Sequence, residues 1–295
     1  MTDTDVRLVC SSDLFASVPR SEALGLIARL GFRYVDLWAC PPMCYHLDPL
    51  AEEPESVRAE LEREGLSVSS LSLFLTTHEE KMAGIEFAVE LGASSIIFEP
   101  GPSKDWSTVM SDLATEGRLI GKPEDTLEQF LATAQPYFRR AEELGINVAL
   151  EVPHVATVVE NLADIERLLA LEHSPSLGLT LAPPHLALAE GNLAEAVERI
   201  GHRVMVLYLW NVKPGYVGSR DGRNYGPSEQ QLGPDGALDL SGAAKTLLEK
   251  AKTRDYVIIA RGTERNPDGE AVARMVNAAL EQVPTPLLQQ LREGR

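Results

Sequence analysis

The amino-acid sequence predicts an α/β protein built as a closed (β/α)8 barrel, and three observations lead to this fold class. Short apolar runs alternate with amphipathic stretches along the 295-residue chain, and eight apolar runs can be counted. Glycines follow several of the amphipathic stretches, as they do at the ends of helices. No glycine-rich dinucleotide fingerprint follows the first run, which together with the eight repeats favours a barrel over an open, doubly wound sheet.

The strands are expected as short apolar runs because helices bury both faces of a parallel sheet. They span residues 6–10, 34–39, 68–75, 95–98, 148–150, 177–181, 204–212 and 256–259. Helices are expected where apolar residues recur three and four positions apart. They span residues 20–30, 55–64, 79–91, 124–144, 162–171, 193–200, 240–252 and 270–283. Pro136 predicts a kink or a break in the fourth helix, because proline lacks the N–H that a helix needs.

A single domain over residues 1–295 is expected, since no change in composition marks a boundary and one α/β barrel commonly has this length. Residues 102–122 and 213–237 are longer links that predict inserted loops. Residues 284–295 predict a short C-terminal extension.

Composition and charge limit the classes of partner. The formal charge of −17 repels polyphosphate backbones, so we expect a small-molecule substrate and no nucleic acid. No apolar run reaches the roughly 18 residues of a membrane span, and the start of the chain lacks the pattern of a secretion signal. Three cysteines cannot all pair within the chain, which favours a reducing, cytoplasmic location. The oligomeric state stays open, and a homo-oligomer is compatible with the sequence.

Polar side chains follow the fifth and sixth expected strands, at the ends where parallel barrels bind their ligands. Glu151 and His154 follow residues 148–150, and His185 follows residues 177–181. Glu151 is a candidate general base, and the histidines are candidates for proton transfer or for binding hydroxyl groups. The alternatives are a Glu151 carboxylate that is merely paired with Arg261, and loop histidines that cap helices.

Five segments follow one another in an order typical of one family: GFRYVDLW, ELGASSIIFEPG, LGINVALEVPH, LGLTLAPPHLALAEGN and LGPDGALDL. They resemble the xylose isomerase-like TIM barrel superfamily, which holds sugar isomerases, epimerases and dehydratases alongside repair enzymes of the endonuclease IV type. The resemblance covers most of the chain. It implies a TIM barrel and a role in carbohydrate metabolism.

The resemblance also implies a divalent metal held by four side chains after strands five to eight, and here the sequence departs from the family. Glu151 matches the first ligand, but Ala182 stands where the family has an aspartate, and Ala260 and Arg261 stand at the last position. For the third ligand, a histidine in the family, the run LYLWNVK offers only Tyr208, Trp210 and Asn211. One carboxylate with scattered histidines binds Mg2+ or Mn2+ weakly, so this degenerate metal site predicts no cofactor. Were a metal present, Glu151 and His185 would be its nearest ligands.

A fixed cation is expected where the family holds its metal. We infer that the guanidinium of Arg261 takes over the metal's charge and holds an anionic or oxyanionic ligand. Other substrate contacts are expected at the strand ends and in the loops after strands seven and eight. These candidates are Glu99, Trp38, Tyr208, Trp210, Asn211, Lys213, Arg220 and Arg223. For the basic residues the alternative is a solvated loop, and for the aromatic residues it is core or rim packing.

The residues and the resemblance together favour a sugar isomerase- or epimerase-like enzyme, or a lyase, acting on a small polyhydroxylated or carbonyl substrate. Glu151 or a histidine would take a proton next to a carbonyl, while Arg261 or Lys213 stabilises the enediolate oxygen. The alternative is a non-catalytic ligand-binding or partner subunit that kept the barrel and lost the metal site. The sequence does not decide between an enzyme and such a subunit. DNA repair would need a metal cluster and a basic groove, and the sequence predicts neither.

Overall fold

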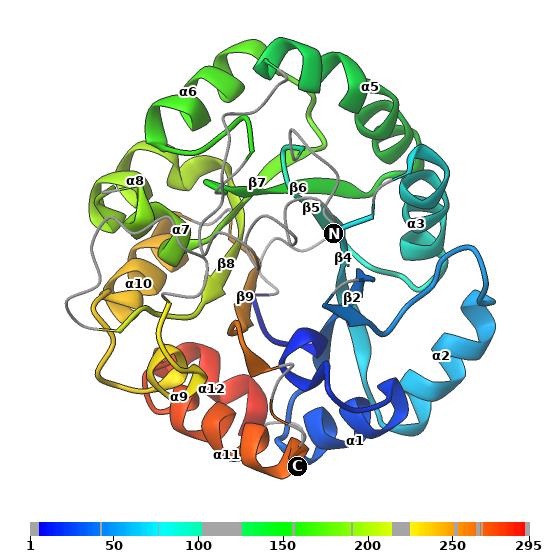
Figure 1. Ribbon diagram of the computed structural model, residues 1–295, viewed down its shortest axis with the longest axis vertical. Coiled ribbons are helices and arrows are strands. Elements are labelled where there is room, and N and C mark those ends of the chain that lie inside the picture. Colours follow the sequence, from blue (N-terminus) through cyan, green and yellow to red (C-terminus); the bar gives the residue numbers. More distant parts are fainter. Residues whose placement is uncertain are drawn as a thin grey trace, which may run out of the picture.

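The apolar runs of the sequence form eight parallel strands that close into a barrel, with helices around it (Figure 1). The computed structural model describes residues 6–41, 43–75, 77–101, 126–154, 157–189, 191–213, 225–250, 253–263, 266 and 268–292. Within these residues the parallel strands follow the order β1-β9-β8-β7-β6-β5-β4-β2, and β1 also pairs with β2, which closes the sheet. The expected (β/α)8 barrel is therefore confirmed.

Nearly every residue of the barrel strands is buried, which explains why they appear in the sequence as continuous apolar runs. The strands are β1 (Arg7–Ser11), β2 (Tyr34–Cys40), β4 (Ser67–Leu73), β5 (Ser95–Phe98), β6 (Asn147–Val152), β7 (Leu177–Leu181), β8 (Val204–Leu209) and β9 (Asp255–Ile258). A short strand, β3 (Cys44–Tyr45), pairs antiparallel with the end of β2 and was not expected from the sequence. β8 ends three residues before the expected run does.

Most of the helices form the outer ring of Figure 1, whereas α7 lies inside this ring. The helices are α1 (Arg20–Arg29), α2 (Pro54–Arg63), α3 (His78–Glu90), α5 (Leu127–Leu144), α6 (Leu162–Leu171), α7 (Pro183–Leu188), α8 (Leu193–Ile200), α9 (Ser228–Leu232), α10 (Leu240–Lys250), α11 (Gly269–Leu280) and α12 (Thr285–Arg292). Two 3-10 turns, η1 (Ser12–Phe15) and η2 (Gly201–Arg203), precede α1 and β8. α7, α9 and α12 were not expected from the sequence.

α5 continues through Pro136, so the predicted break is wrong. Leu131 and Ala134 are buried on one side of the proline, and Phe138 and Ala141 on the other. Each half of α5 therefore packs on the barrel, and this packing outweighs the roughly 3 kcal/mol that an interior proline costs a helix. Thr126 caps the start of α5, and Gly145 ends it in the left-handed conformation, with φ of 71°.

Two hydrophobic clusters show which strand residues face the helices and which face the barrel interior. In β6, Val148, Leu150 and Val152 belong to the larger cluster, which also contains the buried faces of the helices. Ala149, between them, belongs to the smaller cluster. Because side chains alternate along a strand, Glu151 points into the barrel as Ala149 does. The fold thus buries a carboxylate at the carboxyl end of β6.

Other sequence predictions concern the loops and the chain end. Residues 102–122 lie outside the described residues, and so does much of the second predicted loop. The described part of that loop contains α9, and the expected C-terminal extension contains α12. A single domain over the whole chain stays a prediction.

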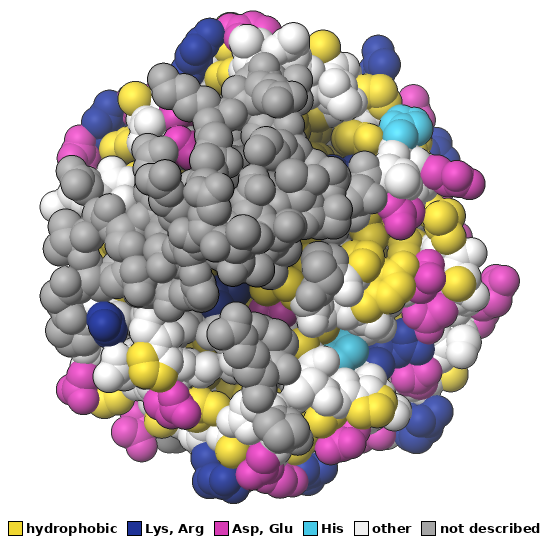
Figure 2. All heavy atoms as spheres, in the orientation of Figure 1, with side chains coloured by type: hydrophobic (Ala, Val, Ile, Leu, Met, Phe, Trp, Pro, Cys, Tyr) yellow, Lys and Arg dark blue, Asp and Glu magenta, His cyan; other side chains and the backbone are white. Residues whose placement is uncertain are grey.

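The charges on the surface and the composition of the helices are relevant to binding of nucleic acids and membranes. On the face seen in Figure 2, acidic and basic side chains are interspersed around the visible edge. Among the described residues, no helix combines the length and the apolar character that crossing a membrane requires.

Candidate functional site

Glu151 is a fully buried carboxylate whose oxygens have no hydrogen-bond partner. Two charged or polar groups approach one of its oxygens: His185, with Nε2 at 3.5 Å from Oε1, and Arg261, with Nη2 at 3.7 Å from the same oxygen. Both distances are too long for good hydrogen bonds. Burying a carboxylate in this way is costly for folding, so the arrangement indicates a site that a ligand completes.

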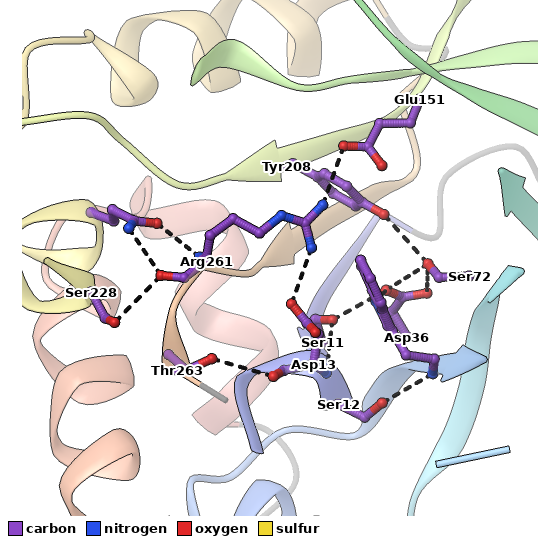
Figure 3. Close-up of polar contacts among 12 residues, drawn as sticks. Ser11, Ser12, Asp13, Asp36, Ser72, Glu151, Tyr208, Ser228, Arg261 and Thr263 are labelled. Carbon is purple, nitrogen blue, oxygen red and sulfur yellow. Dashed lines mark hydrogen bonds and ion pairs between the residues drawn. The ribbon is translucent and has the colours of Figure 1, made fainter. Parts of the chain in front are cut away.

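Arg261 follows β9 and carries the positive charge of this site, as Figure 3 shows. Its Nη1 lies 3.2 Å from Oδ2 of Asp13, on the side away from Glu151. Its guanidinium also lies 4.9 Å from the ring centre of Trp38 and 5.5 Å from that of Trp210. Burial opposes the charge, but Asp13 and Glu151 outweigh this effect and raise the pKa of Arg261. Arg261 is therefore permanently charged.

The backbone of Arg261 is held as firmly as its side chain. The Arg261 N–H donates to Oε1 of Gln231 at 2.8 Å. Its carbonyl accepts from Nε2 of Gln231 at 3.0 Å and from Oγ of Ser228 at 3.4 Å. Both residues belong to α9, so this short helix after β8 fixes the chain after β9 (Figure 3). The guanidinium is thus positioned before any ligand arrives.

His185 and His154 lie side by side at the same end of the barrel. Two prolines open α7 and place His185 in its first turn, where proline suits a helix because the N–H groups there have no partner. The ring centres of the two histidines are 4.3 Å apart. His185 Nδ1 is 3.0 Å from the hydroxyl of Tyr225, while Nε2 faces Glu151 without a hydrogen bond. Burial and the charge of Arg261 lower the pKa of His185 to about 3, so its imidazole is neutral at physiological pH.

Asp36 organises a second group of polar side chains inside the barrel. It is fully buried on β2 and accepts a hydrogen bond from Nε1 of Trp38 at 2.7 Å. Its other donors are the hydroxyls of Ser11, Ser70 and Ser72. Burial raises the pKa of Asp36 to about 6, although the four donors oppose this shift. By holding the indole of Trp38, Asp36 supports one of the two rings against which Arg261 lies.

The structure brings several predicted residues together and separates others. Glu151, His154, His185 and Arg261 share one end of the barrel, and Trp38 and Trp210 flank the guanidinium. Tyr208 lies deeper, with its hydroxyl 3.4 Å from that of Ser72. Glu99 is buried at the end of β5; burial raises the pKa of the Cys40 thiol, and Asp13 and Glu99 add to this shift.

The remaining predicted contacts come from the segment after β8. The amide of Asn211 bonds the backbone of Val212 and Leu238, so it braces the chain there. Lys213 is exposed. Arg220 and Arg223 lie outside the described residues, and their predicted role stays a prediction.

Sequence reasoning missed Asp13 and Tyr225. Asp13 lies in η1, directly after β1, and therefore carries the same signal as Glu151, a carboxylate at the end of a strand. Tyr225 lies near the end of a long polar loop, and no pattern in that loop singles it out.

The four-ligand metal site implied by the resemblance does not fit this barrel. Ala182 is buried and offers no donor atom. The guanidinium of Arg261 lies 3.7 Å from Glu151, where a positive charge opposes a divalent ion bound by this carboxylate. A different group does bring donors together: Glu151, His154 and His185 each offer one ligand atom, all within 4.8 Å of one another.

Comparisons with known proteins agree with the fold. The sequence model of the xylose isomerase-like TIM barrel family matches residues 24–277. Among curated proteins, none matches the chain. A xylose isomerase domain containing protein from Salmonella typhimurium LT2 superposes with a TM-score of 0.69 at 15% identity, over 98% of this chain and 100% of that one.

Two further solved structures are similar over nearly their whole length. D-allulose 3-epimerase from Methylomonas sp., in complex with D-allulose, has a TM-score of 0.65 at 16% identity, over 96% of this chain and 99% of that one. The IolI protein with a bound zinc atom has a TM-score of 0.63 at 13% identity, over 98% and 99%. At these identities the likeness shows the fold alone.

Proposed function

Because the chain belongs to the xylose isomerase-like TIM barrel family, we propose that it is an enzyme of the isomerase or epimerase type. Its substrate is a small polyhydroxylated or carbonyl compound, on which it moves a proton next to the carbonyl carbon. The observation that carries this proposal is the pairing of Glu151, a buried carboxylate without hydrogen bonds, with the fixed charge of Arg261. Epimerases of sugars among the structural neighbours support the substrate class.

Glu151 is the base of the proposed reaction. Both of its oxygens are free of hydrogen bonds, so their lone pairs are available to a C–H bond of a substrate placed at the barrel mouth. Burial also keeps water away from the carboxylate, so solvent does not compete with a bound substrate for its oxygens. A base positioned in this way typically contributes 10²–10⁴-fold to the rate.

Arg261 stabilises the oxyanion that forms when the proton leaves. Asp13 and the two indole rings hold its guanidinium, and α9 holds its backbone, so little reorganisation accompanies the reaction. The resemblance implies a divalent ion that would supply this positive charge, whereas Ala182 and Arg261 stand at two of its implied ligand positions in this chain. We therefore propose a reaction that needs no metal.

His185 binds a substrate hydroxyl rather than carrying a proton. With its pKa lowered to about 3, the imidazolium is scarcely populated at neutral pH, so His185 is a poor general acid. The contact with Tyr225 fixes the ring, and Nε2 faces the same space as the Glu151 oxygens. A neutral imidazole can there accept or donate one hydrogen bond to the substrate.

The second candidate is a binding subunit that has kept the barrel without catalysis. The loss of the family's metal ligands favours it. Incubation in D2O with a panel of ketoses, aldoses and keto acids separates the two candidates, because proton abstraction introduces deuterium next to the carbonyl. We expect exchange by the native protein in the presence of EDTA, a loss of at least about 100-fold in Glu151→Gln, and no loss in the exposed control Glu143→Gln. Tight ligand binding with no exchange would instead support the binding subunit.

A further inference from the structure

Three donors converge at the barrel mouth in a way that the proposed proton transfer does not require. Glu151, His154 and His185 offer a carboxylate oxygen and two imidazole nitrogens within 4.8 Å of one another, and all three residues are buried. We infer that they form a binding site for a late first-row transition-metal ion such as Zn2+, and that this ion switches off Glu151 as a base. The ion is an inhibitor here and takes no part in the reaction.

Two of the donors are unpartnered and face each other. The Glu151 oxygens and His185 Nε2 have no hydrogen-bond partner although both side chains are at most 3% exposed. The other ring nitrogen of His185 contacts the Tyr225 hydroxyl at 3.0 Å. A metal-binding histidine typically has such a second contact, which fixes the ring and directs the free nitrogen at the ion.

The distances suit a small ion. Oε1 of Glu151 and Nε2 of His185 are 3.5 Å apart. Two donors at about 2.0–2.1 Å from a tetrahedral ion lie roughly 3.3 Å apart. The ring centres of His154 and His185 are 4.3 Å apart, and His154 offers a ligand atom within 4.8 Å of those of the other two residues.

The donor types select the class of metal. Two imidazoles and one carboxylate form a ligand set that Zn2+ uses in proteins, with water as a fourth ligand. Mg2+ and Ca2+ prefer oxygen donors and would bind such a set weakly. This set also differs from the family's four ligands, with which it shares only Glu151.

The guanidinium of Arg261 opposes a cation bound to Glu151, but Asp13 compensates part of its charge. Asp13 is closer to Arg261 than Glu151 is, at 3.2 Å against 3.7 Å, and it neutralises this cation. The carboxylate of Glu151, which lies farther from the guanidinium, is then left facing the two imidazoles. Arg261 weakens the metal site without abolishing it.

The consequence for catalysis rests on the proposed function, whereas the metal site itself does not. An ion bound to Glu151 occupies the lone pair that proton abstraction needs. The metal-bound protein is therefore expected to be inactive and to recover on chelation.

The test is titration of EDTA-treated full-length protein with Co2+, whose visible absorption reports coordination, followed by displacement with Zn2+ in a calorimeter. We expect one Co2+ per chain and displacement by Zn2+ but not by Mg2+. His154→Ala, His185→Ala and Glu151→Gln should each weaken Zn2+ binding at least tenfold, and Tyr225→Phe should weaken it by a smaller factor. The exposed His202→Ala is the matched control and should bind as the native protein does.

Circular dichroism and thermal unfolding show whether each variant is folded, and Tyr225→Phe keeps the test informative if a ligand variant is not. The inference is overturned if the native protein shows no change in absorption at millimolar Co2+, or if binding survives in His154→Ala and His185→Ala. Binding without any deuterium exchange in the substrate panel would leave the metal site standing and refute the proposed reaction. Exchange that Zn2+ does not suppress would refute the inhibition alone.

Discussion

The two carboxylates beside Arg261 are expected to affect stability in different ways. We predict that Asp13→Asn destabilises the protein by about 2–4 kcal/mol, because it leaves a buried guanidinium without its nearer counter-charge. Glu151→Gln is predicted to leave the free energy of unfolding unchanged or to raise it by about 1 kcal/mol. The same substitution should abolish the proposed reaction.

The magnitudes follow from the distances. At an effective dielectric constant of about 20, two unit charges attract by about 5 kcal/mol at the 3.2 Å of Asp13 and by about 4.5 kcal/mol at the 3.7 Å of Glu151. Removing a carboxylate from water costs several kcal/mol. Asp13 makes a hydrogen bond to Arg261 that offsets this cost, whereas the Glu151 oxygens make none. Glu151 therefore gains little net stabilisation from its burial.

Urea unfolding of both variants at neutral pH, with EDTA present, measures the contrast. A difference of 2 kcal/mol corresponds to about 4–8 °C in the midpoint of thermal unfolding for a large domain. If Glu151→Gln loses as much stability as Asp13→Asn, Glu151 is a structural partner of Arg261. This result would contradict the proposal that Glu151 is the base.

Three further predictions concern the barrel around the site. The pKa of Asp36 is raised from 3.8 to about 6, so the folded protein binds this proton more tightly than the unfolded chain does. The free energy of unfolding should therefore fall by up to about 3 kcal/mol as pH rises from 4 to 6. Urea unfolding of Asp36→Asn should lack this pH dependence. Gly84→Ala places a Cβ 2.6 Å from Leu73 and should cost about 1–3 kcal/mol in the same assay, whereas Gly25→Ala meets nothing nearer than 3.8 Å and should not destabilise. All three cysteines are free and buried, and burial raises the pKa of Cys40 to about 12, so a thiol reagent should label none of them before unfolding; labelling of the native protein would show that the barrel mouth opens.

The fold was predictable because strands and helices each have their own spacing of apolar residues in the sequence. The ends of the strands were harder to predict, because a residue can be buried without belonging to a strand. β8 ends at Leu209, although the apolar run continues to residue 212. Trp210 and Val212 are buried because they line the barrel mouth, not because they pair with a neighbouring strand. The length of an apolar run therefore overestimates the length of the strand wherever the residues after the strand are also buried at the barrel mouth.

Local sequence was also ambiguous where prolines occur. No helix was expected between residues 181 and 193, and the structure places Pro183 and Pro184 at the start of α7, where the missing N–H groups would have no partner in any case. The position of His185 on a helix follows from this. Only the packing of α7 at the barrel mouth distinguishes a helix from a loop at these residues, and a single sequence does not contain that information.

The closure of the barrel explains why Asp13 was missed and how it could have been found. The resemblance directs attention to strands five to eight, yet a closed barrel pairs its first strand with its last, and β1 indeed pairs with β9. Any carboxylate after the first strand must then lie beside a side chain that follows the last one. Asp13 and Arg261, 248 residues apart, are brought together by this rule alone.

Asp13 determines which chemistry is available to Glu151. If Glu151 alone faced Arg261, the two charges would cancel, and neither a base nor a metal ligand would remain. Because Asp13 contacts the guanidinium from the other side, Arg261 lies between two carboxylates, and the Glu151 oxygens stay free of hydrogen bonds. Asp13→Asn should consequently pull Arg261 towards Glu151 and weaken Zn2+ binding and deuterium exchange together, although Asp13 touches neither ion nor substrate. Unchanged Zn2+ affinity in a folded Asp13→Asn protein would contradict this account of the charge balance.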